Sequence, residues 1–211
     1  MRRIGITPRL EENDSYYEVR ECIDIRWGAF LKELGFLLTP LSVSHTSRDI
    51  RSLDLDGVIF SGGNTPSSLE DSPLSRIRDR FETLLMDHCR KNGIPAIGIC
   101  RGMLFIGEYF GATITKTPKH SGTCHSITFA CEISQLTALA PPAETNSYHT
   151  FGVSSLNSSW NILARSEDSI IEAAIHTTER LLLLMWHPER NSPFSQFDSD
   201  IFQRFFHKDR I

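Results

Sequence analysis

The chain has 211 residues, of which 40% are hydrophobic and 23% are charged, with a formal net charge of -4 and an isoelectric point near 6.1. This length and composition allow one sizeable hydrophobic core, so we expect a single domain over residues 1–211. The slightly acidic balance excludes a bulk attraction for nucleic acid polymers and for anionic membranes.

The N-terminal sequence MRRIGITPRL lacks the apolar stretch of a secretory signal, and no later segment approaches the roughly 20 apolar residues of a membrane span. Five cysteines form no CxxC pair, and their odd number is typical of reduced thiols. We therefore expect a cytoplasmic protein in which one cysteine can serve as a nucleophile.

Short β-rich apolar runs alternate with helical patterns, which predicts βα units around a parallel sheet. The first strand is predicted at residues 3–6. Apolar residues from Val19 to Leu34 recur at helical spacing, which predicts a helix that ends at Gly35 and is capped within residues 13–15. Further strands are predicted at 35–41, 56–63 and 94–100.

Helical spacing of apolar residues over 77–89 predicts a buried helix face between the last two of these strands. Residues 113–185 contain short alternating stretches, which predict a small antiparallel extension of the sheet. The segment IFQRFFHK at 201–208 predicts a final packing helix.

The pentapeptide Gly98-Ile99-Cys100-Arg101-Gly102 joins an apolar strand to a helical pattern, as in a nucleophile elbow. Flanking glycines avoid clashes around a strained nucleophile, and a helix N-terminus favours the thiolate over the thiol. Cys100 is therefore the candidate nucleophile. The alternative is a buried structural cysteine beside a turn.

A candidate base follows another strand-like run, LLLLM, in the sequence Trp186-His187-Pro188-Glu189. His187 can take the thiol proton, and Glu189 can hold the other imidazole nitrogen, as the third member of a triad does. Alone, a His-Pro-Glu turn is more often plain surface structure, but the two motifs together are much more specific.

The third motif, Ser61-Gly62-Gly63-Asn64, follows the strand-like run GVIF. Backbone N–H groups at such a glycine turn can stabilise the oxyanion of a tetrahedral intermediate. We predict that the N–H groups of Gly63 and Arg101 form the oxyanion hole. Without the other two motifs, a simple glycine turn would be the better interpretation.

The segments DGVIFSGG, GICRGM, SYHTF, SIIEAAIH and MWHPE resemble the class I glutamine amidotransferase superfamily, including its γ-glutamyl hydrolase-like branch, in order and across nearly the whole chain. The resemblance implies a flavodoxin-like α/β fold, with an open, mostly parallel sheet, helices on both faces and a small antiparallel extension. It also implies a Cys-dependent hydrolase that cleaves a γ-glutamyl amide through a glutamyl thioester, with Cys100, His187 and Glu189 as the catalytic triad.

The segments ITPRLEENDSYYEVRECIDIRWG and LLMDHCRKNGIPAIGICRGM are similar to a narrower group, the γ-glutamyl-CDP-amidate hydrolases of capsule phosphoramidate biosynthesis. This resemblance implies a small, nucleotide-linked γ-glutamyl substrate that is cleaved to glutamate and cytidine diphosphoramidate.

One position departs from the family pattern, because Leu104 stands where the superfamily usually has a glutamine that helps to hold the glutamyl α-groups. Recognition of these groups then depends on other residues, for which Tyr148, His149 and Asn64 are candidates, together with Gly62.

The N-terminal segment offers groups for an anionic leaving group. Arg9 follows the first strand at the carboxyl edge that binds ligands in open α/β sheets. The predicted helix start at Asn13 would favour phosphate, with Tyr16 and Arg20 nearby. The alternative is a set of solvated side chains and an ordinary helix cap.

Four residues, His120, Cys124, His125 and Cys131, could suggest a zinc site, but they lack regular ligand pairs. We therefore predict no metal, and no cofactor is implied.

Two other functions remain open. The chain could be a glutaminase subunit that supplies ammonia to a separate synthetase, although the absence of GxxxxGK[ST] and of an acceptor domain favours independent action. It could also be a non-catalytic binding protein on the same fold, for which Leu104 is the one favourable feature. A synthetase partner or a homodimer is compatible with either enzymatic function.

Overall fold

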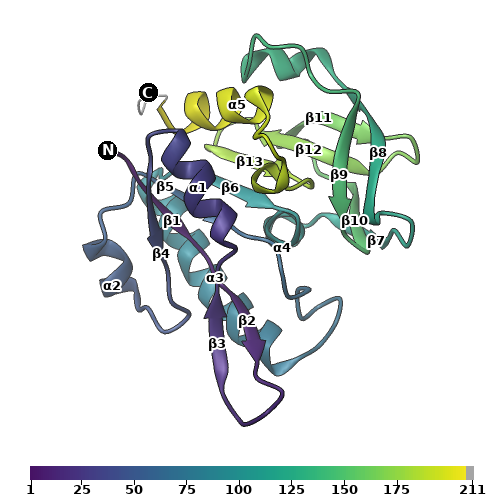
Figure 1. Cartoon of the computed structure of the whole chain (residues 1–211). Coiled ribbons are helices and arrows are strands. Elements are labelled where there is room, and N and C mark those ends of the chain that lie inside the picture. Colours follow the sequence, from purple (N-terminus) through teal and green to yellow (C-terminus); the bar gives the residue numbers. More distant parts are fainter. Residues whose placement is uncertain (208–211) are drawn as a thin grey trace.

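The computed structural model describes residues 1–207, and five parallel strands form the centre of its sheet (Figure 1). Their order is β4, β1, β5, β6 and β13, at Leu37–Pro40, Arg3–Ile6, Gly57–Phe60, Ala96–Ile99 and Leu181–Leu184. The strands predicted at 35–41, 56–63 and 94–100 are confirmed, with shorter bounds. The open, mostly parallel α/β architecture is also confirmed.

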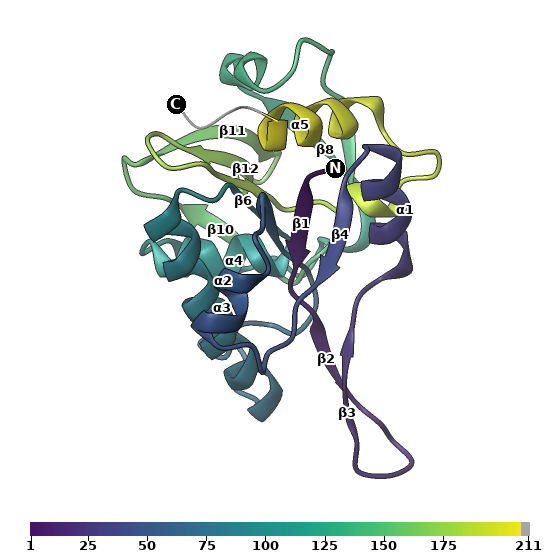
Figure 2. The same cartoon turned by 90° about the vertical axis from the view of Figure 1, so that its left-hand side faces the viewer.

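Helices cover both faces of the parallel strands (Figure 2). On one face lie α1 (Ile25–Glu33) and α5 (Gln196–His207), and their aromatic side chains pack on Ile4, Ile97 and Leu182. The other face is covered by α2 (Ser47–Ser52), α3 (Pro73–Asn92) and α4 (Arg101–Tyr109), which pack on Val58 and Leu183. Alternate strand residues thus enter two separate apolar cores, as expected for a sheet that is buried on both faces.

The helix predicted over 77–89 is the central part of α3, which is one of the longest elements of the fold. Ser72 caps its first turn by accepting a hydrogen bond from the Ser75 N–H, and it ends at Gly93, whose φ of 62° suits a residue without a Cβ.

The antiparallel extension predicted for 113–185 is confirmed. Strand β12 (Ile171–His176) pairs with β13, and β11 (Trp160–Ser166), β8 (Ser121–Phe129) and β9 (Glu144–Tyr148) continue the sheet outward. Strand β10 (Phe151–Ser155) pairs with β12 and with β7 (Thr113–Lys116). A short 3-10 helix at Cys131–Gln135 connects β8 to the loop before β9.

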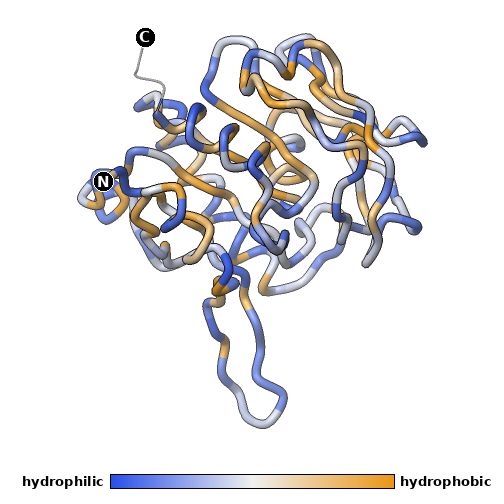
Figure 3. The backbone as a smooth tube through the Cα atoms, turned by 45° about the horizontal axis from the view of Figure 1, so that its top comes forward, coloured by the Kyte–Doolittle hydropathy of each residue, from blue (hydrophilic) through white to orange (hydrophobic). Residues whose placement is uncertain are grey.

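The helix predicted to begin at residues 13–15 is wrong at its N-terminal end. Residues Arg9–Glu12 (β2) and Val19–Cys22 (β3) instead form an antiparallel hairpin, which projects from the body of the molecule (Figures 1 and 3). The hairpin is mostly hydrophilic, so it offers no continuous apolar face to pack as a helix.

The real helix begins later, after Asp24, whose carboxylate accepts a hydrogen bond from the Arg26 N–H at 3.0 Å. It buries Trp27, Phe30 and Leu31, so the apolar spacing was correctly interpreted only from about residue 25 onward. The N–H groups near Asn13 therefore do not form a helical phosphate site.

The predicted C-terminal helix is confirmed and extends further toward the N-terminus than expected, from Gln196; its predicted last residue, Lys208, lies outside the described residues. Within residues 1–207, none of the helices combines the length and apolar character that a bilayer crossing requires.

Candidate active site

Cys100 occupies a strained turn between β6 and α4. Its φ of 51° and ψ of -105° lie in a region that residues with a Cβ rarely adopt. A Cβ on Gly98 would lie 2.7 Å from the Gly102 carbonyl oxygen, and one on Gly102 would overlap the Phe60 carbonyl oxygen. Both flanking glycines are thus required by close backbone packing, as the elbow interpretation predicts.

His187 and Glu189 follow β13, the parallel neighbour of β6, so that they lie at the same edge of the sheet as Cys100. Residues Pro188–Arg190 form a short 3-10 helix that turns the Glu189 carboxylate back toward the imidazole. His187 Nδ1 lies 2.7 Å from Glu189 Oε1, and both side chains are buried. The hydrogen bond leaves Nε2 of His187 available to the thiol.

The electrostatics of His187 favour its protonated form. Burial alone lowers the pKa of this imidazole, but the charge and hydrogen bond of Cys100 and the contact with Glu189 outweigh burial and raise it to about 9. Cys100 and His187 are thus placed as an interacting pair of the kind found in thiolate–imidazolium sites.

The glycine turn after β5 closes the third side of this site. A Cβ on Gly62 would lie 2.8 Å from His187 Cε1 and 3.7 Å from Cys100 Cβ, so the turn faces the gap between these two side chains. Gly63 has a φ of 107°, a backbone conformation that residues with a Cβ rarely adopt. A glycine at this position therefore allows the peptide groups of the turn to take this orientation. Arg101 is the first residue of α4, where N–H groups have no acceptor inside the helix.

A buried ion-pair network holds the glycine turn against the elbow, and no sequence motif marked it. Arg78 donates to the Ser61 carbonyl at 2.7 Å and to the Gly62 carbonyl at 2.9 Å. Its Nε also donates to Glu82 Oε1 at 2.9 Å, and the other oxygen of Glu82 pairs with Arg101. The sequence showed only the apolar periodicity of α3, and this pattern predicts that Arg78 and Glu82 face the solvent.

The side chain of Arg101 also takes part in this network. Its guanidinium group is fully buried, donates to the Asn64 carbonyl at 3.0 Å and pairs with Asp79. The network ties Arg101, the residue after Cys100, to the glycine turn that faces Cys100.

The base of the N-terminal hairpin forms one wall of the site. A Cβ on Gly63 would meet Arg9 Cβ at 2.6 Å, and a small cavity of about 30 Å³ is lined by Arg9, Cys22, Gly62, His187 and Glu189 together with six neighbouring residues. The Arg9 guanidinium is half-exposed and pairs with Glu11 at 2.5 Å. Its predicted position at the carboxyl edge of the sheet agrees with this geometry.

Three other N-terminal candidates lie on the projecting part of the hairpin. The Asn13 N–H donates to the Glu18 carbonyl across the turn, Tyr16 is exposed there, and Arg20 on β3 pairs with Glu18 and donates to the Tyr16 hydroxyl at 3.1 Å. The structure does not bring these side chains to Cys100.

The Asn64 side chain is engaged with the backbone of the hairpin. Its amide accepts from the Leu10 N–H and donates to the Leu10 carbonyl, each at 2.8 Å, so Asn64 fastens the hairpin base to the glycine turn. Leu104 is buried in the apolar core under α4 and presents no polar group to a ligand.

Tyr148 and His149 point to different places although they are adjacent in the chain. The Tyr148 ring packs edge-on against the His187 ring, with centroids 5.6 Å apart, and the Arg190 guanidinium lies 4.3 Å from the Tyr148 ring. The His149 side chain is instead buried beside His120 and His125. Desolvation and the neighbouring His120 lower its pKa to about 3.

Asn146 is a further residue that sequence reasoning missed. Its amide accepts from the His187 N–H and donates to the His187 carbonyl, each at 2.9 Å, and thereby fixes the backbone of the candidate base. No motif marked Asn146, since it contacts His187 from a strand 41 residues earlier in the chain.

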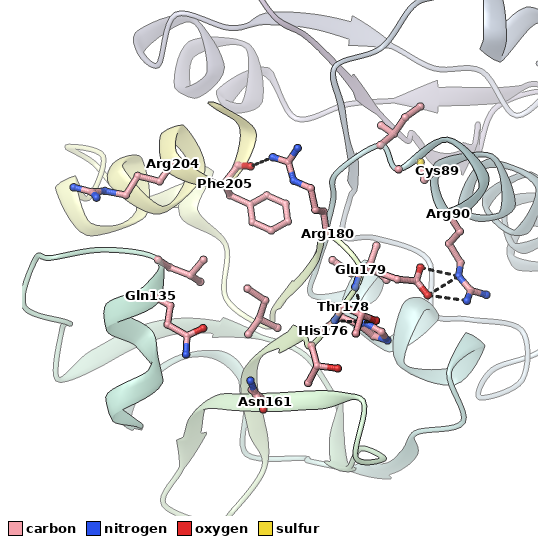
Figure 4. A pocket seen from close by; sticks show the side chains of 16 residues that line it. Cys89, Arg90, Gln135, Asn161, His176, Thr178, Glu179, Arg180, Arg204 and Phe205 are labelled. Atoms are coloured by element: carbon pink, nitrogen blue, oxygen red, sulfur yellow. Dashed lines mark hydrogen bonds and ion pairs between the residues drawn. The ribbon is translucent and has the colours of Figure 1, made fainter. Parts of the chain in front are cut away.

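A cavity of about 620 Å³ (Figure 4) lies beside Ile94 and Arg180, which precede β6 and β13, and thus at the opposite end of these strands from Cys100. Its lining includes Cys89 and Arg90 at the end of α3, Arg180 before β13 and Phe205 on α5. It is remote from Cys100 because β6 and β13 run away from it toward the elbow.

The peptidase C26 family matches residues 4–189 of the chain, a span that contains Cys100, His187 and Glu189. The chain belongs to this family. The match covers the central strands, apart from the first residue of β1, and the three candidate catalytic residues, which agrees with the class I glutamine amidotransferase resemblance of the sequence.

Two kinds of enzyme appear among the relatives. The chain is 36% identical over 191 residues to a γ-glutamyl-CDP-amidate hydrolase of Campylobacter jejuni, with 90% of each chain covered. It is 29% identical to a glutamine-hydrolyzing GMP synthase subunit of Thermoplasma volcanium, with 86% of each chain covered.

Solved structures support the same fold. A crystal structure of a putative GMP synthase subunit from Thermoplasma acidophilum matches with a TM-score of 0.71 at 21% identity, covering 98% of this chain and 92% of the other. A glutamine amidotransferase structure from Thermotoga maritima matches with a TM-score of 0.66 at 13% identity, covering 96% of this chain and 82% of the other.

Proposed function

We propose that the protein hydrolyses γ-glutamyl-CDP-amidate to glutamate and cytidine diphosphoramidate, with Cys100 as nucleophile, His187 as base and Glu189 as the group that orients it. The observation that carries the chemistry is the convergence of the strained Cys100, the buried His187–Glu189 pair and the Gly62–Gly63 turn at one edge of the sheet. The substrate assignment is supported by the relative from Campylobacter jejuni.

The reaction has two steps. The Cys100 thiolate attacks the γ-carbonyl carbon, and the N–H groups of Gly63 and Arg101 stabilise the resulting oxyanion. As the C–N bond breaks, the His187 imidazolium gives its proton to the leaving nitrogen, which leaves a glutamyl thioester on Cys100. Water then attacks the thioester while His187 accepts the water proton, and glutamate departs with regeneration of the thiolate.

Arg9 is the residue best placed to recognise the phosphorylated leaving group. Its side chain belongs to the hairpin base that lines the wall beside His187, and half of it is exposed, so the guanidinium can exchange Glu11 for a ligand phosphate at little desolvation cost. Tyr148, which packs edge-on against the His187 ring, is the candidate contact for the glutamyl portion.

Ammonia supply to a synthetase is the second candidate function, and the GMP synthase relatives favour it. Glutamine would then be the preferred substrate, and hydrolysis would accelerate when the partner is bound. The chemistry at Cys100 is the same in both functions, so only substrate preference separates them.

The test is a comparison of kcat/KM for γ-glutamyl-CDP-amidate, glutamine and a γ-glutamyl polyamine, with release of glutamate as the common readout. We expect a strong preference for the nucleotide-linked amide and no turnover by Cys100→Ala. Preference for glutamine would support ammonia supply instead. Turnover by folded Cys100→Ala would refute the catalytic assignment itself.

A further inference from the structure

Four ligand-type side chains meet in the antiparallel extension, outside the candidate active site. His120, His125, His149 and Glu172 each offer one atom to a group in which all four atoms lie within 4.8 Å of one another. Glu172 Oε1 lies 3.6 Å from His120 Nδ1, 3.6 Å from His125 Nε2 and 3.7 Å from His149 Nε2. These distances exceed those of hydrogen bonds, so the four groups do not satisfy one another directly.

The outer nitrogen of each imidazole has a partner of its own. His120 Nε2 donates to Asp168 Oδ2 at 3.0 Å, His125 Nδ1 donates to the Ser126 carbonyl at 3.2 Å, and His149 Nδ1 donates to the Phe151 carbonyl at 2.9 Å. Because a neutral imidazole carries one proton, these bonds place the protons on the outer nitrogens. Three nitrogen lone pairs and a carboxylate therefore face one another.

The inner atoms of the cluster are buried without a partner. His120 Nδ1, His125 Nε2, His149 Nε2 and both oxygens of Glu172 accept no hydrogen bond from any residue in the described part of the chain. The side chains of His120, His149 and Glu172 are 7%, 2% and 1% exposed. Such a concentration of unsatisfied acceptors is costly unless a cation lies among them.

We propose that His120 Nδ1, His125 Nε2, His149 Nε2 and Glu172 Oε1 bind a divalent transition-metal ion, with zinc as the best-suited ion. Neighbouring ligand atoms of a tetrahedral zinc ion lie about 3.3 Å apart for bonds of about 2.0–2.1 Å. A small inward movement of the four side chains would bring their ligand atoms to this spacing. The outer hydrogen bonds to a carboxylate and to backbone carbonyls are those that orient histidine ligands in metal sites.

The four protein ligands make this a closed site of the structural kind. His120 directly precedes β8 and His125 lies in its middle, whereas His149 belongs to the connection between β9 and β10 and Glu172 to β12. The ion therefore joins β8 to β12, which are separated in the sheet by β11. Since His149 directly follows Tyr148, metal binding also holds the strand end that places Tyr148 against His187.

Metal content measured by mass spectrometry after exhaustive buffer exchange is the first test. We expect wild type loaded with Zn²⁺ to retain about one ion per chain. Glu172→Gln keeps the side-chain volume but weakens the ligand, so it should lower zinc affinity by at least about tenfold. His88→Ala, which removes a histidine on α3 that bonds only to Asn92 among the described residues, is the control and should retain the ion.

A gentler pair of variants separates metal binding from misfolding. Asp168→Ala removes the exposed carboxylate that orients His120, whereas Glu167→Ala removes its exposed neighbour in the chain. We expect zinc affinity to fall roughly ten- to a hundredfold in Asp168→Ala and to be unchanged in Glu167→Ala.

Titration of wild type with Co²⁺ provides a readout that is independent of every variant. The visible absorption of tetrahedral Co²⁺ without a thiolate charge-transfer band is expected, because the ligand set contains no sulfur. A thiolate band would place the ion on cysteine and overturn the proposal. Absence of tightly held Zn²⁺ in folded wild type, or equal retention by Glu172→Gln, would overturn it as well. None of these results depends on the substrate, so the proposed hydrolase function is tested separately.

Discussion

The pKa of His187 sets the protonation state of the candidate base over most of the usable pH range. Its folded value of about 9 lies above the ordinary value of 6.5, so the charged imidazole is stabilised by folding. That contribution to the free energy of unfolding is complete below about pH 6.5 and is lost as the pH rises through 9. The same imidazolium is the proposed proton donor to the leaving nitrogen.

The rate of acylation should therefore have an alkaline limb near pH 9, with kcat/KM falling roughly tenfold for each further pH unit. Glu189→Gln removes one of the contacts that raise the pKa and should move this limb to lower pH while lowering kcat about 10²- to 10⁴-fold. Full pH profiles of both proteins check this expectation. An unmoved limb in the variant would mean that another group titrates.

Glu82 compensates two buried guanidinium groups at once, so its charge is more important for stability than that of a surface carboxylate. Glu82→Gln leaves Arg78 and Arg101 without their shared counter-ion and should lower the free energy of unfolding by about 3–5 kcal/mol. Glu179→Gln is chemically identical but disrupts a partly exposed pair with Arg90, and should cost at most about 1 kcal/mol. Urea denaturation of both variants makes the comparison, and equal losses would contradict the assigned role of the network.

The close packing of the turn between β6 and α4 predicts that alanine is not tolerated at Gly102. Gly102→Ala places a methyl group against the Phe60 backbone, which cannot move without disturbing β5, so we expect at least about 2 kcal/mol of destabilisation and loss of turnover. Gly28→Ala on the exposed side of α1 meets no atom within 4 Å and should stabilise the protein by up to about 1 kcal/mol. Thermal melts and activity assays compare the two variants. If Gly102→Ala left both stability and turnover unchanged, the close contact with the Phe60 backbone would not constrain the elbow.

The position of Arg9 at the base of the β2–β3 hairpin predicts a role in the preference for a phosphorylated substrate over glutamine. An arginine–phosphate hydrogen bond contributes on the order of 1.5–3 kcal/mol, so Arg9→Ala should lower kcat/KM for γ-glutamyl-CDP-amidate roughly ten- to a hundredfold more than for glutamine. Arg76→Ala, which removes an arginine paired with Asp71 at the surface, is the control. The measured quantity is the ratio of the two specificity constants, and an unchanged ratio in Arg9→Ala would separate Arg9 from the leaving group.

The elements of the fold differed in how far the sequence could predict them. The strands and α3 carry strong apolar patterns, and the elbow and the His-Pro-Glu turn lie where such strands end, so their proximity followed from parallel pairing. The hairpin was missed because its stability rests on backbone pairing and on Asn64, which leaves no apolar period. The Arg78–Glu82 pair was missed because charged residues in a helix are normally exposed.

The histidine cluster could not be predicted from the sequence, because its members come from distant parts of the chain. Sequence proximity grouped His120 and His125 with Cys124 and Cys131, but adjacent residues of a strand point to opposite faces, so Cys124 cannot join His125. In the structure both cysteines are exposed, and the remaining candidate ligands come from far along the chain. Only the folded antiparallel extension brings the four groups together.

The position of β13 has a consequence for how the protein is made. This strand lies between β6 and β12, although it is the last of the strands in residues 1–207 to leave the ribosome. Until it inserts, β6 keeps an open parallel edge, which is a template for pairing with other chains. A nascent chain that already contains Cys100 thus lacks both the proposed base, His187, and the strand that closes its sheet. We therefore expect translation that stops before Leu181 to yield a polypeptide that is inactive and prone to aggregate.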